Sequence, residues 1–358
     1  MDLFGDLPAP TNAGCKNEAS PVEEKTEEMD EKVEERGEKR KRDGDLDQQQ
    51  VEEKDEAEKK VCKGLAKLKG VVAARRGERE EMQDAHVLLP NLSECMKTLP
   101  AQVSRLSYFA VFDGHGGARA SQFAAENLHH TVISKFPKGD VENLDKLVKK
   151  CLLDSFRQTD EDFLKKASSQ KPAWKDGSTA TCLLVVDNVL YVANLGDSRA
   201  VLCRIEQTDS GDENCVTLAL SKEHNPTIYE ERMRIQRAGG SVRDGRVLGV
   251  LEVSRSIGDG QYKRCGVIST PDLRRCQLTP KDRFVILACD GLFKVFSAEE
   301  AIKYVNKILQ QDSGVDGKAG QTLEEAGRYE EACQRLASEA VRRGCADNVT
   351  VILISIEF

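Results

Sequence analysis

Six short runs of aliphatic and β-branched residues constrain the fold of this chain more than any other feature. They cover residues 108–112, 179–186, 189–195, 199–205, 284–289 and 349–356. Their length and composition are typical of buried β-strands. Asp187-Asn188 has the chemistry of a two-residue hairpin turn, and Gly196-Asp197 supplies the next turn. The three middle runs are therefore predicted to form a meander.

Two segments carry apolar residues at helical spacing. The first stripe is Ala120, Phe123, Ala124, Leu128, Val132 and Phe136, and the second is Leu144, Leu147, Val148, Cys151, Leu152 and Phe156. Residues 323–343 predict a third, more polar helix. Hairpins beside paired helices indicate an α+β fold, with antiparallel sheets covered by helices, rather than a βαβ repeat.

The first part of the chain has a different composition. No aromatic residue lies between Phe4 and Tyr108, and residues 23–60 hold 17 acidic against 10 basic side chains, a net charge of −7 out of −8 for all 358 residues. Such a segment buries too little apolar surface to offset its ordering entropy. We expect a disordered tail over residues 1–68 and a catalytic domain over 69–358. A solvated, charged single helix is the alternative for the tail.

Residues 39–42 of this tail read Lys-Arg-Lys-Arg, a run that nuclear import receptors can bind. A run that only keeps the tail soluble is the alternative. The chain starts without a signal-peptide pattern and has no 18-residue apolar stretch, so we expect an intracellular protein of cytoplasm and nucleus. The twelve cysteines form no Cys-x-x-Cys pair, and we expect reduced, mostly buried thiols rather than disulfides or a zinc site.

Aspartates lie at the ends of three of the apolar runs. Asp113-Gly114 and Asp290-Gly291 each follow a run, and Asp347 precedes the last one. If these strands are neighbours in one sheet, with the last antiparallel to the others, the three carboxylates emerge at the same edge. Carboxylates so close together repel, so either their pKa values rise or a cation neutralises them.

Mg²⁺ and Mn²⁺ prefer the carboxylate, carbonyl and water oxygens that such an edge offers. The glycines would let a backbone carbonyl or a bulky substrate approach the metal. A lone Asp-Gly is more often a simple turn. Two of them at strand ends, together with Asp347-Asn348, favour a metal centre.

Two other catalytic motifs are poorly matched. Gly196-Asp-Ser-Arg-Ala200 resembles a nucleophile elbow, but the residues after it predict a strand where the elbow needs a helix. The glycine-rich segment 114–120 lacks the Gly-Lys-Ser/Thr ending of a phosphate-binding loop. His115 could be a turn residue, yet a proton donor two positions from Asp113 would be useful.

Seven motifs in order resemble the metal-dependent serine/threonine protein phosphatases of type 2C. They are GEREEMQDAH (77–86), FAVFDGHGG (109–117), DGSTATCLLV (176–185), ANLGDSRAVL (193–202), EVSRSIGDGQYK (252–263), ILACDGLFKV (286–295) and ADNVTVIL (346–353). The resemblance covers residues 69–358. It implies a four-layer α-β-β-α sandwich, in which two antiparallel sheets are flanked by helix pairs.

The resemblance also implies the residues of a centre with two Mg²⁺ or Mn²⁺ ions. Asp113 would bridge the ions and the Gly114 carbonyl would bind one of them. Asp290 and Asp347 would complete the other, and Asp84 would act through metal-bound water.

The catalytic residues implied by the resemblance are Arg79 and His115. Arg79 would hold the substrate phosphate, where a planar guanidinium suits two phosphate oxygens. His115 would protonate the leaving serine or threonine oxygen. The nucleophile would be water between the metals, activated by a lowered pKa, so no phosphoenzyme is needed.

Two positions depart from the family pattern. Gln83 replaces a common glutamate before Asp84, which keeps an acceptor oxygen and removes a charge. Asp197 matches a ligand of a third, weaker metal, but Lys294 replaces a further aspartate of that site. Because an ammonium opposes a third cation, we expect weak or absent third-metal binding.

Residues 221–262 match the flap that lies beside the catalytic cleft in the family. Its Glu-Arg-Met-Arg-Ile-Gln-Arg segment (231–237) carries arginines, among them Arg234 and Arg237, that could contact acidic or phosphorylated protein. An ordinary solvated helix face is the alternative.

We therefore expect Mg²⁺- or Mn²⁺-dependent hydrolysis of phosphoserine and phosphothreonine in proteins by a monomer. A non-catalytic phosphatase fold that docks kinases is the main alternative, favoured by Gln83 and Lys294. A two-metal nuclease is disfavoured because the near-neutral catalytic region lacks a basic footprint. The expected partners are phosphorylated proteins and, by resemblance only, a protein kinase; no membrane or nucleic acid is expected.

Overall fold

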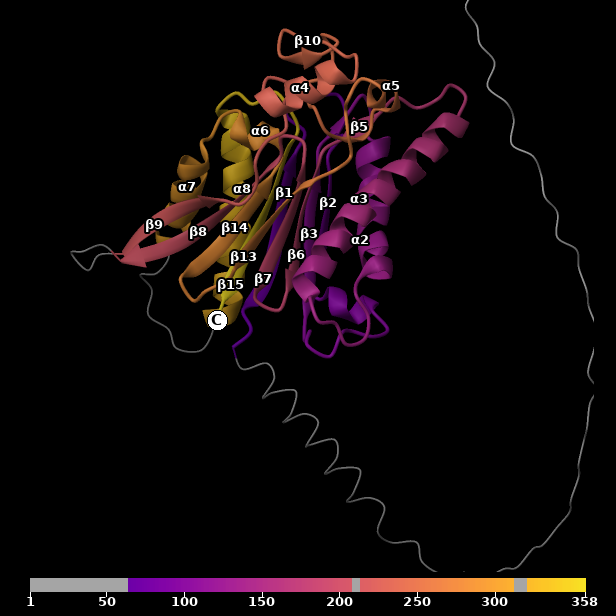
Figure 1. Ribbon diagram of the computed structural model, residues 1–358. Coiled ribbons are helices and arrows are strands. Elements are labelled where there is room, and N and C mark those ends of the chain that lie inside the picture. Colours follow the sequence, from indigo (N-terminus) through magenta and orange to yellow (C-terminus); the bar gives the residue numbers. More distant parts are fainter. Residues whose placement is uncertain (1–63, 208–212, 312–320) are drawn as a thin grey trace, which may run out of the picture. The chain divides into compact units, whose positions relative to one another are not determined.

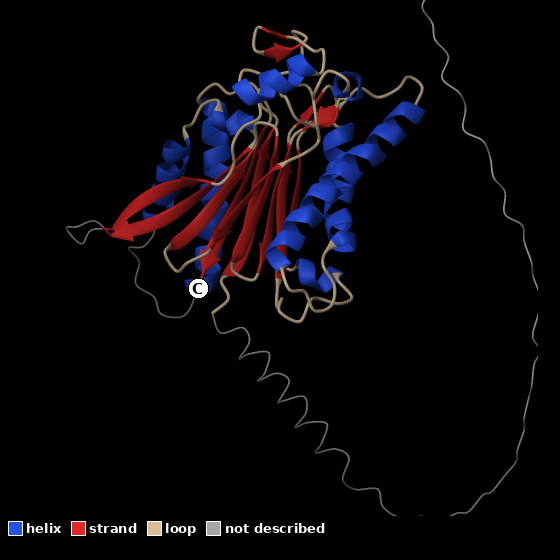
Figure 2. Ribbon diagram, viewed as in Figure 1, coloured by secondary structure: helices blue, strands red, loops and turns tan. Residues whose placement is uncertain are grey.

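Two five-stranded antiparallel sheets form the centre of the computed structural model (Figure 1, Figure 2). The structure describes residues 64–207, 213–311 and 321–358. The chain divides into two units, Met1–Asp55 and Glu56–Phe358, and all described residues lie in the second. The basic run 39–42 and most of the predicted tail therefore lie outside the described residues, and β1 begins at Lys67.

The first sheet has the strand order β13-β7-β6-β3-β2. Its strands are β2 (Ala85–Leu89), β3 (Leu106–Phe112), β6 (Ala180–Val186), β7 (Val189–Leu195) and β13 (Asp272–Gln277). β6 and β7 form the predicted hairpin, in which Val186 pairs with Val189. Asp187 at the turn has a φ of 53°, the left-handed conformation that such turns require.

The second sheet has the order β1-β15-β14-β8-β9. Its strands are β1 (Lys67–Arg75), β8 (Arg199–Gln207), β9 (Glu213–Ala219), β14 (Asp282–Ala288) and β15 (Val349–Glu357). The predicted meander is therefore wrong at its third strand, because β8 pairs with β14 and β9. The free edge of β7 is taken by β13 instead, and the Gly196-Asp197 turn carries the chain to the other sheet.

Helices cover the outer face of each sheet. α2 (Arg119–Lys135) and α3 (Leu144–Ser169) cover the first sheet, and α7 (Ala298–Gln311) and α8 (Gln321–Arg342) the second (Figure 1). The side chain of Asn143 caps α3 by accepting a hydrogen bond from the Lys146 amide at 3.0 Å. Within the described residues, no helix is long and apolar enough to cross a membrane.

Three apolar layers hold the four structural layers together. Tyr108, Ala110 and Phe112 of β3 face the helices, whereas Phe109 and Val111 face the second sheet. This alternation buries both faces of the strand, which explains why its sequence is a continuous apolar run. The α-β-β-α sandwich predicted from the sequence is confirmed.

Shorter elements lie near one end of the sheets. A three-stranded sheet joins β12 (Ile257–Gly258), β5 (Gly177–Ser178) and β4 (Gly114–His115). The others are α4 (Tyr229–Arg237), α5 (Gly260–Lys263), α6 (Asp290–Phe293) and the hairpin of β10 (Val242–Arg243) and β11 (Arg246–Val247). A 3₁₀ turn, Leu92–Cys95, lies at the opposite end of the first sheet, where Ser93 accepts a hydrogen bond from the amide of Leu106 at the start of β3. In Figure 1, α4 and β10 lie beyond the strand ends, where the flap was expected.

The ten cysteines of the described residues form no disulfide. Cys182, Cys203 and Cys289 lie in the core, as expected for small apolar side chains.

Candidate metal centre and catalytic cleft

A cleft of about 360 Å³ opens where the two sheets end next to the flap. Its charged and imidazole side chains are Arg79, Asp113, His115, Lys175, Asp197, Glu252, Asp259, Asp290, Lys294 and Asp347. The sequence residues proposed for the site therefore meet here, with Gln83 and Gly114 also in the lining. Asp84 lies close to Asp113 but does not line the cleft.

The aspartates reach this cleft from both sheets rather than from one. Asp113 follows β3 of the first sheet, whereas Asp290 follows β14 and Asp347 precedes β15 of the second. The supposition that these strands are neighbours in one sheet, with the last antiparallel, holds for β14 and β15 and is wrong for β3. The carboxylates still gather because the two sheets end together, and Thr350 of β15 donates a hydrogen bond to Asp84, just before β2, at 2.7 Å.

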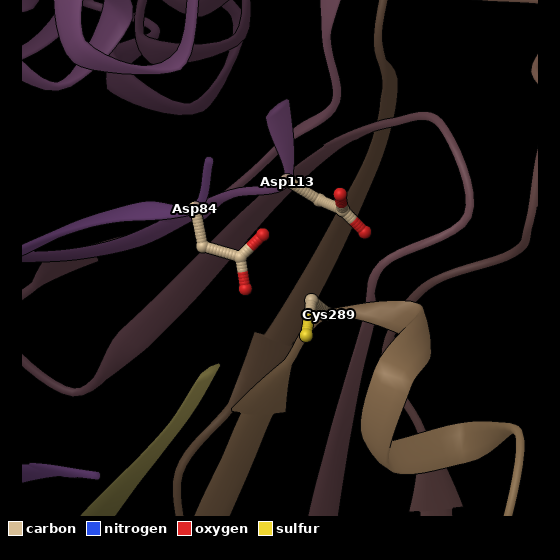
Figure 3. A group of neighbouring side chains, drawn as sticks. All are labelled: Asp84, Asp113 and Cys289. Atoms are coloured by element: carbon tan, nitrogen blue, oxygen red, sulfur yellow. The ribbon is translucent and has the colours of Figure 1, made fainter. Parts of the chain in front are cut away.

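Two overlapping clusters of potential metal ligands share Asp113. Carboxylate oxygens of Asp113, Asp197 and Asp290 lie within 4.8 Å of one another. Ligand atoms of Asp84, Asp113 and Cys289 meet the same limit (Figure 3). One oxygen of Asp84, Oδ1, is buried without a hydrogen-bond partner.

The electrostatics of these carboxylates favour the binding of a cation. Burial, reinforced by neighbouring carboxylates, raises the pKa of Asp113 well above its ordinary value. Burial also raises the pKa of Asp84 to about 6, and burial with the Asp290 charge raises the pKa of Asp197 to about 7. Divalent cations with a preference for oxygen fit such a donor set, and they would satisfy the orphaned Asp84 oxygen.

The glycines beside the aspartates have a packing role in addition to the one expected from the sequence. A Cβ on Gly114 would lie 2.2 Å from the carbonyl oxygen of Gln83, and a Cβ on Gly291 would lie 2.0 Å from that of Asn348. Both glycines thus allow the protein's own backbone to pack against the aspartate-bearing turns. Their presence follows from this packing and does not by itself indicate a substrate.

Two cationic side chains contact the outer part of the cluster. The Lys294 ammonium lies 2.7 Å from Oδ2 of Asp290 and 2.8 Å from Oδ2 of Asp347. Arg79 lies 2.9 Å from the same Asp347 oxygen, with its side chain 56% exposed. Burial opposes ionisation of Asp347, but its hydrogen bond to Lys294 and the charge of that ammonium lower its pKa. Lys294 therefore neutralises part of the acidic cluster.

His115 forms a dyad with Asp259, a residue that the sequence did not single out. Nε2 of His115 lies 2.7 Å from Oδ2 of Asp259, which is buried. Burial alone would lower the pKa of His115, but the charge and hydrogen bond of Asp259 raise it. A Cβ on Gly177 would lie 2.1 Å from that Asp259 oxygen, so only glycine fits beneath the dyad.

A buried ionic network anchors the flap and uses one of the arginines expected to bind substrate. Arg234 donates to both carboxylate oxygens of Glu231, at 2.8 and 2.7 Å, and to the carbonyls of Ser254 and Gly266. Arg255 contacts the same Glu231 at 2.7 Å. The Arg234 guanidinium thus donates its hydrogen bonds within the flap. The prediction that it could contact acidic or phosphorylated protein is wrong for this arginine. Arg237 is exposed.

A model of the family "Protein phosphatase 2C" matches residues 68–349. The chain belongs to the protein phosphatase 2C family. Among its relatives, the integrin-linked kinase-associated serine/threonine phosphatase 2C of Homo sapiens is 65% identical over 302 residues, which cover 84% of this chain and 76% of that protein. The probable protein phosphatase 2C 67 of Oryza sativa subsp. japonica is 39% identical over 298 residues, covering 81% and 76%.

The fold is shared with solved phosphatase 2C structures. The serine-threonine phosphatase 2C of Toxoplasma gondii superimposes with a TM-score of 0.65 at 24% identity, covering 82% of this chain and 95% of that chain. This protein phosphatase 2C is accordingly a hydrolase of a metal-dependent protein phosphatase family, and its acidic clusters offer oxygen ligands for the metal.

Proposed function

We propose that this protein phosphatase 2C hydrolyses phosphoserine and phosphothreonine in proteins with water as the nucleophile and two divalent cations, Mg²⁺ or Mn²⁺, as cofactors. The observation that carries the proposal is the convergence of half-buried carboxylates in one cleft, where the pKa values of Asp113 and Asp197 are raised. Such a cluster is unfavourable by itself and favourable around cations.

The side chains that would hold the cations come from both sheets. We assign Asp113 as the bridging ligand, since it belongs to both clusters. Asp290 and Asp347, with the Gly114 carbonyl, would complete the inner ligands, and Asp84 would act through water. When bound, the cations supply Lewis acidity, which makes water acidic enough to attack phosphorus near neutral pH.

Two side chains of the cleft would act on the substrate directly. Arg79 projects into the cleft with an exposed guanidinium and would bind two oxygens of the phosphate. His115 would protonate the leaving alkoxide of the serine or threonine. Asp259 supports this step because its carboxylate orients the ring and favours the protonated imidazolium.

Lys294 bears on the number of cations. Its ammonium bridges Asp290 and Asp347, the position from which a further cation would have to compete for the same oxygens. We propose that Lys294 takes the place of a third metal and that Asp197 serves the two-ion centre, from which its oxygen is only a short distance away.

The test is phosphate release from a phosphothreonine peptide during titration with Mn²⁺ and Mg²⁺. We expect metal-dependent turnover that chelator abolishes. Asp290→Asn should lower it by more than about a hundredfold, since even the loss of a ligand's outer hydrogen-bond partner costs roughly 10- to 100-fold. Asp162→Asn, an exposed aspartate on α3, is the matched control. Folded protein without turnover at any metal concentration would favour the docking module instead.

Partners and location are also proposals. The name of the human relative associates that protein with integrin-linked kinase, and we propose the same partner here. We also propose that the protein acts as a monomer in signalling, in the cytoplasm and the nucleus, with residues 39–42 directing import. Loss of nuclear signal on replacing these four residues by alanine would support their role in nuclear import. An unchanged distribution of the protein between cytoplasm and nucleus would contradict it.

A further inference from the structure

The flap holds a short loop, Leu248-Gly249-Val250, whose two ends are fixed. Val247 donates a backbone hydrogen bond to the Leu251 carbonyl at 2.8 Å, and Leu251 donates one to the Val247 carbonyl at 3.2 Å. Both residues are buried in a small core within the flap, formed by Ile235, Val247, Leu251, Val253, Tyr262 and Val267. Residues 248–250, here called the flap loop, therefore project from a rigid base.

The side chains of the flap loop are apolar and face solvent. Leu248 is 43% and Val250 61% exposed, and they are two of only six large apolar side chains exposed in the described part of the chain. The residues at the two ends of the loop are thus buried and hydrogen-bonded, whereas the apolar side chains at its tip are exposed to solvent. A pair of exposed aliphatic side chains on an anchored loop is typical of a contact site.

The backbone of the flap loop is strained at the leucine. Leu248 has a φ of 53°, and Gly249 follows with a φ of 77°. The left-handed region is unfavourable for a residue with a Cβ, and asparagine or glycine would relieve that cost. The Leu248 amide is held by the Ser241 carbonyl at 2.8 Å. A bulky residue kept in this conformation is the kind of outlier that gathers at functional sites.

The flap loop is continuous with the catalytic cleft. Val250 and its neighbour Leu251 line the same cavity as Asp113 and His115. Glu252, the next residue in the lining, is paired with Arg246, so its charge is balanced beside the apolar tip. A peptide that brings its phosphate to the aspartate cluster would pass the flap loop with a nearby side chain.

We propose that the flap loop is a subsite for an apolar side chain of the phosphoprotein substrate, close in sequence to the phosphorylated residue. Two aliphatic side chains offer enough surface for one leucine-sized group, and too little for a whole protein face. Val250 lies on the cleft wall and Leu248 lies two residues before it in the same loop, so the occupant is the substrate itself. This inference rests on the proposed phosphatase function and adds to it a preference for apolar neighbours.

The experiment measures kcat/KM on a series of phosphothreonine peptides. Leucine is moved from three residues before to three residues after the phosphothreonine, and each peptide is compared with serine at that position. In the wild-type protein we expect leucine to raise kcat/KM about fivefold at one position or more, from partial burial of its side chain. In Leu248→Asn and Val250→Ser this ratio should fall close to one.

Leu248→Asn is the more informative variant because asparagine tolerates a positive φ, so the loop should keep its conformation and the protein its melting temperature. Tyr229→Ser is the matched control, because Tyr229 is 64% exposed on the same flap but belongs to α4 and not to the flap loop. It should keep the wild-type ratio.

Two results would overturn the inference. One is a wild-type protein that hydrolyses leucine and serine peptides equally at every position; the proposed phosphatase activity would then stand without the subsite. The other is a leucine preference that survives in both loop variants. A wild-type protein that hydrolyses neither the peptides nor para-nitrophenyl phosphate would overturn the proposed function and the subsite together.

Discussion

Asp197→Asn should stabilise the metal-free protein at neutral pH and have little effect in acid. The pKa of Asp197 is raised from 3.8 to about 7, because burial and the Asp290 charge disfavour its ionised form. In the unfolded chain the carboxyl ionises at its ordinary pKa. The protonated Asp197 carboxyl therefore causes no loss of folding stability below about pH 3.8. As the pH rises from there toward 7, this one group progressively lowers the unfolding free energy. Asparagine carries no charge and escapes this loss.

The magnitude follows from the difference between the two pKa values. Each difference of one in pKa corresponds to 1.36 kcal/mol, so a difference of about 3 between the folded and unfolded pKa values of Asp197 corresponds to about 4 kcal/mol. The side chain keeps some contact with solvent at the cleft, and screening there reduces the expected gain to about 2–3 kcal/mol at pH 8. At pH 4 the gain should be close to zero.

Urea unfolding of both proteins in chelator, followed through the fluorescence of Trp174, the only tryptophan, measures the gain. The difference in unfolding free energy between variant and wild type should grow from pH 4 to pH 7 and then level off. Saturating Mn²⁺ should shrink it, because a cation that binds the folded wild type stabilises it. Asp162→Asn should show no such pH dependence. A gain that is the same at pH 5 and pH 8, or a variant less stable at pH 8, would refute the reasoning.

Three further predictions concern the cleft and the flap. His115→Gln should lower kcat on a phosphothreonine peptide about 10²- to 10⁴-fold and Asp259→Asn less; unchanged kcat in both would remove the dyad from the mechanism. Lys294→Asp should raise the number of Mn²⁺ ions bound per protein in equilibrium dialysis, and an unaltered number would contradict the view that the ammonium replaces a metal. Arg234→Ala should lower the unfolding free energy by about 3 kcal/mol, because it leaves a buried carboxylate short of a partner. Exposed Arg237→Ala should stay within about 0.5 kcal/mol, and equal effects of the two would refute the anchoring role.

The sequence predicted the strands well where both faces are buried, because a short, continuous apolar run such as 284–289 is typical of a buried strand. It could not assign strands to sheets. β3 and β14 are equally apolar, so composition does not tell which sheet each belongs to. Only the structure shows that β13 pairs with β7 and that β8 therefore pairs with β14 in the second sheet. Asp113, Asp290 and Asp347 were found because each stands at the end of such a run, whereas Asp84 and Asp197 were assigned only by the resemblance to the family.

The dyad partner and the flap contacts were not predictable in the same way. Asp259 sits in an Ile-Gly-Asp-Gly segment, which resembles an ordinary turn, and its role depends on a left-handed backbone and on Gly177 from a distant strand. Its sequence signal is an Asp-Gly pair, one of seven in the chain, and this does not distinguish it from the others. Arg234 and Arg237 are alike in sequence, and only the burial of Glu231 distinguishes an anchor from a free cation.

The charges of the proposed metal centre also bear on how many cations it would hold. Its five carboxylates and the two cationic side chains that contact Asp347 leave a formal charge of −3; they are Asp84, Asp113, Asp197, Asp290 and Asp347, with Arg79 and Lys294. Two divalent cations, as proposed, would convert this to +1, which would still attract a phosphate dianion. A third would bring the formal charge to +3 and would have to displace Lys294 from Asp290 and Asp347. The ammonium thus keeps the centre close to neutral once substrate binds, and this balance favours a two-ion centre in this chain.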